Sequence, residues 1–453
     1  MSGWSEKLLE RGIQFVRKQD WEGAARVLSD AVKYDTGMYE AWVLRGNVRM
    51  AQEMYLDAAL HYERAISIKG DLADAWSNLG SAFLKMGMYQ AARDAYRRSM
   101  QVKDSWEPHA GLANMYCDLM DLKQAEEECQ KALAIDNTAD RHFYLGCVQL
   151  GQGKWKEGFE NYYYRWLDHP QAPLARRALP QWQGEDLTGR TIVLYPNQGF
   201  GDEIMAMRFA SRDCLSEARH IVLQTRSPLA DIARHPDREI KALNGTLPRA
   251  DYACSTLDLP MVLGLNWDEV NCPPYLTADP VRAARWRERM PKGFNIGVCW
   301  TSGGHFSSSL SIQRIKSMRV EALAAFKQPG VNLISLQKPV IEAIPAALEI
   351  TDWMEEVDDF ADTAALIAAL DLVISVDTSV AHIAGAIGAR VWNFVRFSGY
   401  WPWLAPDVCG PDKSIWYPSM KLYRQPRGHD WEEPVRRAAK DLEVLLADTV
   451  GNN

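Results

Sequence analysis

The residues best suited to chemistry follow a short apolar run at 372–376, which is too brief for a helix and is typical of a buried strand. The next three residues belong to types that cap a helix N-terminus: Asp377, Thr378 and Ser379. A helix of small residues is expected at 380–388, where Gly388 ends it. Backbone N–H groups and the positive end of the helix dipole converge at such a turn, and a phosphate is their natural ligand, although the same pattern also serves merely to cap a helix. His382 lies one helical turn after Thr378 and could join this site.

A second candidate follows the strand expected at 191–195. Glycines at 199 and 201 allow a tight turn in which the backbone approaches a ligand closely, and Asp202 begins the next helix. A carboxylate at the mouth of a strand can take the proton from an acceptor hydroxyl. Asp is also an ordinary helix N-cap, and spacing alone favours that role. We assign Gln198, Gly199 and Gly201 to a loop on the acceptor side.

A third group of candidates follows the strand expected at 295–300. Gly303 and Gly304 make a flexible turn at its carboxyl end, which suits a diphosphate or a sugar and equally suits an ordinary loop. Tyr400 belongs to an aromatic segment at 397–403 that could stack on a sugar or a base, and core packing would use the same rings.

The elements before these candidates repeat themselves over residues 5–168. Small residues recur at Gly12, Gly46 and Gly80, 34 positions apart, which is the tetratricopeptide period of paired helices. Aromatic residues with the same spacing are expected to pack between repeats: Trp42, Trp76, Tyr55, Tyr89, Tyr62 and Tyr96. About five repeats predict an all-α solenoid that holds a peptide or a protein. Three asparagines could clamp a peptide backbone: Asn47, Asn78 and Asn114.

Composition narrows the class of protein. The 453 residues are too many for one core, and 47% hydrophobic with 24% charged residues is typical of soluble globular proteins. The sequence has no long apolar run, and charges stand where a signal peptide needs an apolar core, so we expect no membrane span and a cytoplasmic location. Scattered cysteines predict free thiols, and the net charge of −8 argues against nucleic acid as a partner.

Residues 359–394 resemble the nucleotide-sugar-binding segment of glycosyltransferases related to the lipopolysaccharide heptosyltransferases (family nine-like), in the version that carries tetratricopeptide repeats. The resemblance continues through 416–420 and 422–426. It implies a GT-B fold, in which two Rossmann-like halves follow the repeats and the second half holds a nucleotide-diphosphate sugar. We expect the solenoid at 1–168 and the two halves at 175–290 and 291–453. The amphipathic tail at 431–446 is expected to pack back across the first half.

The resemblance also implies roles for single residues. Gly201-Asp202 matches the Gly-Asp whose aspartate is regarded as the catalytic base of these transferases. Lys316 falls where the family has a basic residue, and it would contact the diphosphate rather than be a solvated surface charge. Gln337 ends a strand as it does in the relatives, and the choice of sugar would depend on contacts around Trp300, Gly304 and Tyr400. The donor-binding set is therefore Lys316, Asp377, Thr378, Ser379, His382, Gly303, Gly304, Trp300 and Gln337.

The function expected from the sequence is an inverting, metal-independent transfer of a hexosyl or heptosyl group from a nucleotide-diphosphate sugar to a protein recruited by the repeats. Asp377 would orient donor hydroxyls, or it would only cap its helix. No cofactor is expected besides the donor substrate, and a homo-oligomer is left open. Two alternatives stay open: an acceptor that is a lipid-linked saccharide or a modified nucleic acid, and a repeat scaffold whose transferase domain does not catalyse.

Overall fold

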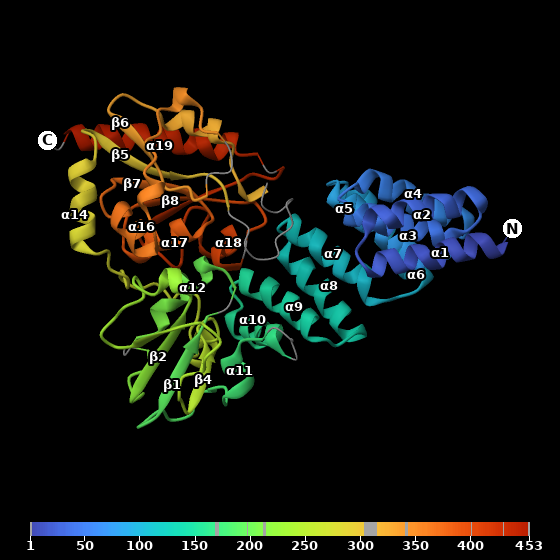
Figure 1. The fold of residues 1–453 in the computed structure, drawn as a ribbon, viewed down its shortest axis with the longest axis horizontal. Coiled ribbons are helices and arrows are strands. Elements are labelled where there is room, and N and C mark those ends of the chain that lie inside the picture. Colours follow the sequence, from blue (N-terminus) through green and yellow to red (C-terminus); the bar gives the residue numbers. More distant parts are fainter. Residues whose placement is uncertain are drawn as a thin grey trace. The chain divides into compact units, whose positions relative to one another are not determined.

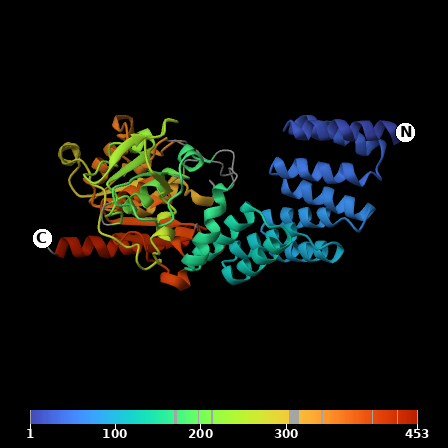
Figure 2. The same cartoon turned by 90° about the horizontal axis from the view of Figure 1, so that it is seen from below.

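Contacts divide the chain into two units, Met1–Val148 and Gln149–Asn453. In the first unit, helices follow one another in hairpin pairs. The computed structural model describes residues 2–167, 172–196, 198–211, 214–302, 315–339, 343–399, 401–428 and 430–451. The helices of the first unit, whose succession Figure 2 shows, are α1 (Ser2–Arg17), α2 (Trp21–Tyr34), α3 (Tyr39–Ala51), α4 (Tyr55–Ile68), α5 (Ala73–Lys85), α6 (Tyr89–Val102), α7 (Trp106–Asp118), α8 (Leu122–Ile135) and the start of α9 (Ala139–Gly151).

The recurring glycines let paired helices approach closely. A Cβ placed on Gly46 would lie 2.3 Å from Cε1 of Tyr62, and one on Gly80 would lie 2.7 Å from Cδ1 of Tyr96. Both tyrosine rings are fully buried, so they cannot turn away into solvent. The small residues of the repeat therefore pack directly against its aromatic residues, as their common spacing predicted.

The three asparagines differ in their surroundings. Asn47 accepts hydrogen bonds from the hydroxyl of Tyr62 (2.8 Å) and from Nδ2 of Asn78 (3.2 Å), so these two amides bond each other within the helical array. Asn114 is exposed on α7. A peptide-clamping role stays a prediction for all three.

The second unit contains two parallel sheets (Figure 1). The first has the order β3-β2-β1-β4, with β1 (Thr191–Tyr195), β2 (His220–Thr225), β3 (Glu239–Ala242) and β4 (Tyr252–Ser255). Its connections carry α12 (Phe200–Ala206), η2 (Met207–Phe209) and η3 (Ser227–Leu229), and α13 (Leu259–Val262) follows β4. Every side chain of β1 is buried, as expected for a strand covered on both faces.

The second sheet has the order β6-β5-β7-β8-β9, reached through α14 (Pro280–Arg289). Its strands are β5 (Phe294–Cys299), β6 (Val331–Ser335), β7 (Leu372–Val376), β8 (Val391–Val395) and β9 (Met420–Arg424). The other described elements are η4 (Val320–Phe326), η5 (Ala346–Leu348), η6 (Met354–Glu356), α16 (Phe360–Ile367), α17 (Ser379–Ala386), η7 (Trp401–Trp403), α18 (Pro406–Cys409) and α19 (Glu432–Gly451). The order reverses between β5 and β7, and parallel sheets bind ligands in the crevice at such a switch point.

Helices at both ends of this unit pack onto the sheets. α10 (Trp155–Tyr162), η1 (Tyr163–Trp166) and α11 (Leu174–Ala178) precede β1, and contacts group them with the α/β region, so the division falls inside α9 rather than near residue 168.

α19 buries Val435, Ala438 and Leu442 in the core of the second sheet. The tail therefore covers the second half, whereas we expected it across the first, because its apolar face meets β9 and η4.

Candidate functional site

The switch point of the second sheet gathers the polar residues expected there. Cys299 at the end of β5 is in register with Ser375 on β7, so the chain leaves both strands at the same edge. The hydroxyl of Thr378 lies 3.0 Å from Oγ of Ser375 and 3.7 Å from Sγ of Cys299. The segments after β5 and β7 therefore lie side by side, as two neighbouring parallel strands require.

Thr378 is the N-cap residue of α17, but its side chain makes no capping hydrogen bond because the hydroxyl pairs with Ser375. The helix begins at Ser379, and Gly388 follows it with φ at +79°, a conformation that glycine adopts without strain. With the side-chain cap engaged elsewhere, the first N–H groups of α17 suit an anionic ligand.

Asp377 lies beside two cationic or ionisable groups. Its Oδ2 is 3.4 Å from Nζ of Lys316, and its Oδ1 is 3.9 Å from Nε2 of His382. Burial acts to raise the pKa of Asp377, but its neighbours, above all the positive charge of Lys316, oppose burial, and the pKa is lowered. The carboxylate is therefore anionic at neutral pH, and Lys316 is held next to the switch point.

His382 is an uncharged, fixed ring. It is 6% exposed, stacks on Trp403 with ring centroids 5.3 Å apart, and shares a hydrogen bond of 2.9 Å between Nδ1 and the hydroxyl of Tyr417. Burial lowers its pKa to about 4, against the opposing influence of Asp377. A neutral imidazole can hydrogen-bond a ligand but does not add charge to the site.

Trp300 and Gln337 have mainly structural surroundings. The ring of Trp300 is fully buried in the apolar core of the second half. Oε1 of Gln337 accepts from the backbone N–H groups of Trp300 (3.2 Å) and Thr301 (2.9 Å), which fixes the chain where it leaves β5. Gly303, Gly304 and Tyr400 lie outside the described residues.

Asp202 lies in the first turn of α12. Gly199 is the N-cap, and its N–H donates to Oδ2 of Asp202 over 3.0 Å. Asp202 is therefore not the N-cap that spacing alone favoured: it is the third residue of a helix that begins earlier, at Phe200, and its partly exposed carboxylate accepts a hydrogen bond from the N-cap residue. A base role for this carboxylate stays a prediction.

The two α/β halves meet where α12 packs against α17. A Cβ on Gly201 would lie 2.7 Å from Cδ2 of His382, so only glycine leaves room for the ring at this point. Beside them, the rings of Phe200 and Phe360 are 5.1 Å apart. The Gly-Asp turn of the first half therefore touches the helix that begins at the switch point of the second half.

Sequence reasoning missed several residues that shape this region. Glu203 has a fully buried side chain, with Nε of Arg226 2.8 Å from its Oε2 and a further hydrogen bond from the hydroxyl of Thr225. Burial raises the pKa of Glu203, and Arg226 opposes this shift. No local pattern could reveal the pair, because its partners are far apart in sequence. Tyr417 lies within the resembling stretch 416–420, and a closer study of that stretch could have found it.

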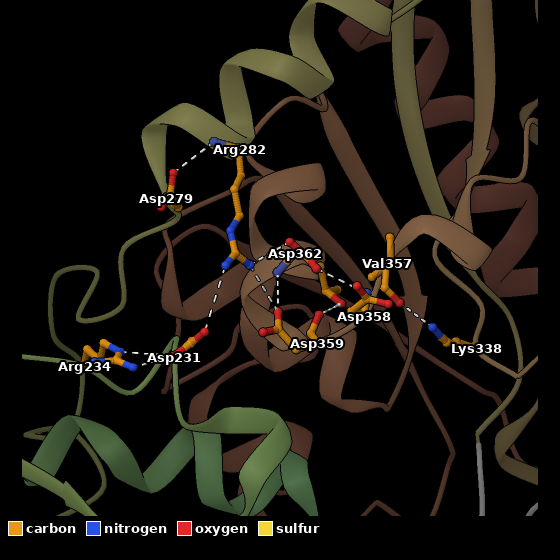
Figure 3. Close-up of polar contacts among 10 residues, drawn as sticks. Asp231, Arg234, Asp279, Arg282, Lys338, Val357, Asp358, Asp359 and Asp362 are labelled. Carbon is orange, nitrogen blue, oxygen red and sulfur yellow. Dashed lines mark hydrogen bonds and ion pairs between the residues drawn. The ribbon is translucent and has the colours of Figure 1, made fainter.

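Arg282 of α14 joins the two halves by charge (Figure 3). Its Nη1 lies 2.7 Å from Oδ1 of Asp362 and 3.5 Å from Oδ1 of Asp359, at the start of α16. Its Nη2 lies 4.0 Å from Oδ2 of Asp231 in the first half, which also pairs with Arg234. All these groups are partly exposed, so the network contributes little to stability.

Comparisons with known proteins identify the helical region. Two family models match it, one described as TPR repeat over residues 46–87 and one as tetratricopeptide repeat over residues 73–105. The N-terminal region carries tetratricopeptide repeats. Protein FlbA of Caulobacter vibrioides is similar to most of the chain: it is 25% identical over 422 residues, and the match spans 84% of this chain and 69% of FlbA.

Two solved structures are similar to part of the chain. The crystal structure of MamA protein is 22% identical, with a TM-score of 0.32, and the match covers 36% of this chain and 91% of MamA. A thermophilic TPR protein of Thermus thermophilus is 16% identical, with a TM-score of 0.34, and the match covers 37% of this chain and 92% of that protein.

Neither a membrane-spanning helix nor a cluster of metal ligands is found among the described residues. Among the described residues, no helix has both the length and the apolar character that crossing a membrane requires. In the same part of the chain, no group of three or more His, Cys, Asp and Glu side chains could hold a metal ion.

Proposed function

We propose that the α/β unit is a GT-B glycosyltransferase that moves a hexosyl or heptosyl group from a nucleotide-diphosphate sugar with inversion. The contact between Gly201 and His382 carries the proposal, since it brings the turn that bears Asp202 against the helix that begins at Thr378. A candidate base and a candidate phosphate site, far apart in sequence, thus belong to one region.

The donor side would stabilise the leaving diphosphate without a metal. The first N–H groups of α17 and the ammonium group of Lys316 would interact with the negative charge that grows as the sugar–phosphate bond breaks. Asp377 now holds Lys316 at 3.4 Å. In the complex, Lys316 would reach the phosphates while Asp377 accepts hydrogen bonds from donor hydroxyls. The neutral His382 would serve as a hydrogen-bonding wall of this site.

The acceptor side would supply the base. An acceptor hydroxyl oxygen forms a bond to the anomeric carbon as the bond from that carbon to the diphosphate breaks. The hydroxyl proton goes to the carboxylate of Asp202, and the nucleoside diphosphate leaves with the bonding electrons. Direct displacement inverts the anomeric configuration.

The acceptor that fits best is a protein held by the tetratricopeptide repeats, since such arrays present extended surfaces to peptides and proteins. A lipid-linked saccharide would use the same chemistry. The capping role of Asp202 favours one different function, a repeat scaffold that does not catalyse, because a capping carboxylate needs no substrate.

Donor binding tests the proposal. Purified full-length protein is titrated calorimetrically with ADP-, UDP-, GDP-, dTDP- and CMP-linked sugars, and we expect one nucleotide to bind. Lys316→Ala should weaken that binding about tenfold or more, in line with a charge-assisted contact to phosphate. The matched control is Lys327→Ala, which removes an exposed lysine that pairs with Glu349 in the same half. Asp202→Asn should bind normally, because the amide oxygen can still accept from Gly199. Failure of every nucleotide sugar to bind would favour the scaffold.

A further inference from the structure

The turn that bears Asp202 has a strained backbone just before it. Gln198 has φ at +57°, in the left-handed region that side chains other than glycine rarely adopt. A residue keeps such a conformation only when its surroundings fix it, and residues of this kind gather at functional sites.

Two groups from other elements fix Gln198. Its carbonyl oxygen accepts from Nη2 of Arg226 over 2.7 Å, and the same guanidinium is 2.8 Å from the buried carboxylate of Glu203 in α12. Its side-chain amide donates to the hydroxyl of Tyr162 in α10. The turn is therefore held from the sheet side by Arg226 and from the helical side by Tyr162.

The helix that carries Tyr162 is a rigid support. Trp155, Phe159 and Tyr162 are all at most 2% exposed. The ring of Trp155 stacks on Trp416 with centroids 5.6 Å apart, and the ring of Tyr162 meets Trp401 at 5.7 Å, so α10 is packed into the second half.

An ion pair in the next turn fixes the same segment to the first half. Nη2 of Arg165 lies 2.7 Å from Oδ1 of Asp258, and the two side chains are 4% and 5% exposed. The same nitrogen donates to Oγ of Ser255 at the end of β4 over 3.1 Å. Buried pairs of this kind are costly to break, so the segment cannot move away from the sheet without loss of stability.

We propose that Tyr162 is a positioning residue for the turn of Gln198 to Asp202, so that α10 sets the geometry of the candidate base. This inference rests on the proposed transferase function for its catalytic consequence. Its structural consequence, that the hydroxyl of Tyr162 helps Arg226 to order the turn, does not rest on it.

The test compares three variants of the full-length protein. Tyr162→Phe removes the hydroxyl and keeps the ring in its packed site. Gln198→Gly removes the side chain while glycine adopts the positive φ without strain, so the backbone conformation of the turn is kept. Tyr163→Phe is the matched control, because its hydroxyl pairs with Gln183 and not with the turn.

Two readouts separate the inference from the proposed function. Amide hydrogen exchange of residues 199–206 should speed up at least tenfold in Tyr162→Phe and Gln198→Gly, and stay unchanged in Tyr163→Phe. With a donor that turns over, kcat should fall about 10- to 100-fold in the first two variants with KM of the donor nearly unchanged, because the base is misplaced and the donor site is intact.

Equal exchange and equal kcat in Tyr162→Phe and Tyr163→Phe would overturn the inference. If no nucleotide sugar reacts with the wild-type protein, the transferase function fails. The exchange measurement alone then decides whether Tyr162 holds the turn.

Discussion

Gly201→Ala tests whether α12 of the first half packs against His382 of the second half as closely as it does in the structure. The new Cβ would lie 2.7 Å from Cδ2 and 3.1 Å from Nε2 of His382. The ring cannot retreat, because Trp403 stacks on its face and Tyr417 holds its Nδ1. Overpacking of this kind costs about 1–3 kcal/mol, which corresponds to a fall in melting temperature of roughly 2–6 °C for a unit of this size.

Differential scanning calorimetry of the full-length protein measures this shift. Gly199→Ala is the control in the same turn, since its Cβ would meet only Oδ2 of Asp202, at 3.3 Å, an approach that a shift of a few tenths of an ångström relieves. A second arm combines Gly201→Ala with His382→Ala. If the clash is the cause, the added methyl group should cost less than about 0.5 kcal/mol once the ring is gone. An equal cost in both backgrounds, or equal effects at Gly199 and Gly201, would refute the contact.

Three other perturbations have expected outcomes. Because the pKa of His382 is about 4, only the unfolded chain binds a proton at this residue between pH 6.5 and pH 4. Acidification through this window should therefore remove up to about 3 kcal/mol of stability. Urea titrations at each pH should show a smaller loss of stability for His382→Gln, and an equal loss would contradict the lowered pKa. Gly46→Ala should destabilise the repeats by about 1–3 kcal/mol through its clash with Tyr62. In calorimetry it should lower the temperature of an unfolding transition that Gly201→Ala leaves unchanged. If both variants shift the same transition, this expectation is wrong. Arg282→Ala should cost about 1 kcal/mol or less in dilute salt and almost nothing in 1 M NaCl, and a cost that salt does not reduce would show that the network is not electrostatic.

Local pattern was enough to predict the centre of the candidate site. The run at 372–376 is β7, and its residues are buried on both faces. Thr378 occupies the N-cap position of the following helix, as its residue type suggested, although its hydroxyl pairs with Ser375 instead of capping the helix. The strand and the start of the helix depend on residues that are close together in the sequence, so a short stretch of sequence is enough to predict them. The 34-residue spacing of Gly12, Gly46 and Gly80 predicted the repeats for the same reason, and two family models confirm them.

Contacts between distant residues could not be predicted. Nothing in the sequence near Gln198 indicates that Tyr162 and Arg226 hold it, or that its φ is positive. The burial of the Trp300 ring was also beyond local pattern, because a tryptophan at the end of a strand can face a ligand or the core. The tail helix was misplaced because its amphipathic face predicts burial but does not say against which sheet.

The central claim, that this chain transfers a sugar, is tested most directly by a transfer measurement. The wild-type protein and Asp202→Asn are each expressed in the same host, and intact-mass spectrometry of the host proteins that copurify is combined with an assay for released nucleoside diphosphate. We expect a hexose or heptose mass increment and diphosphate release with the wild type, and neither with Asp202→Asn, which should still bind the donor. Donor binding without any transfer by the wild type, or equal transfer by Asp202→Asn, would contradict the claim.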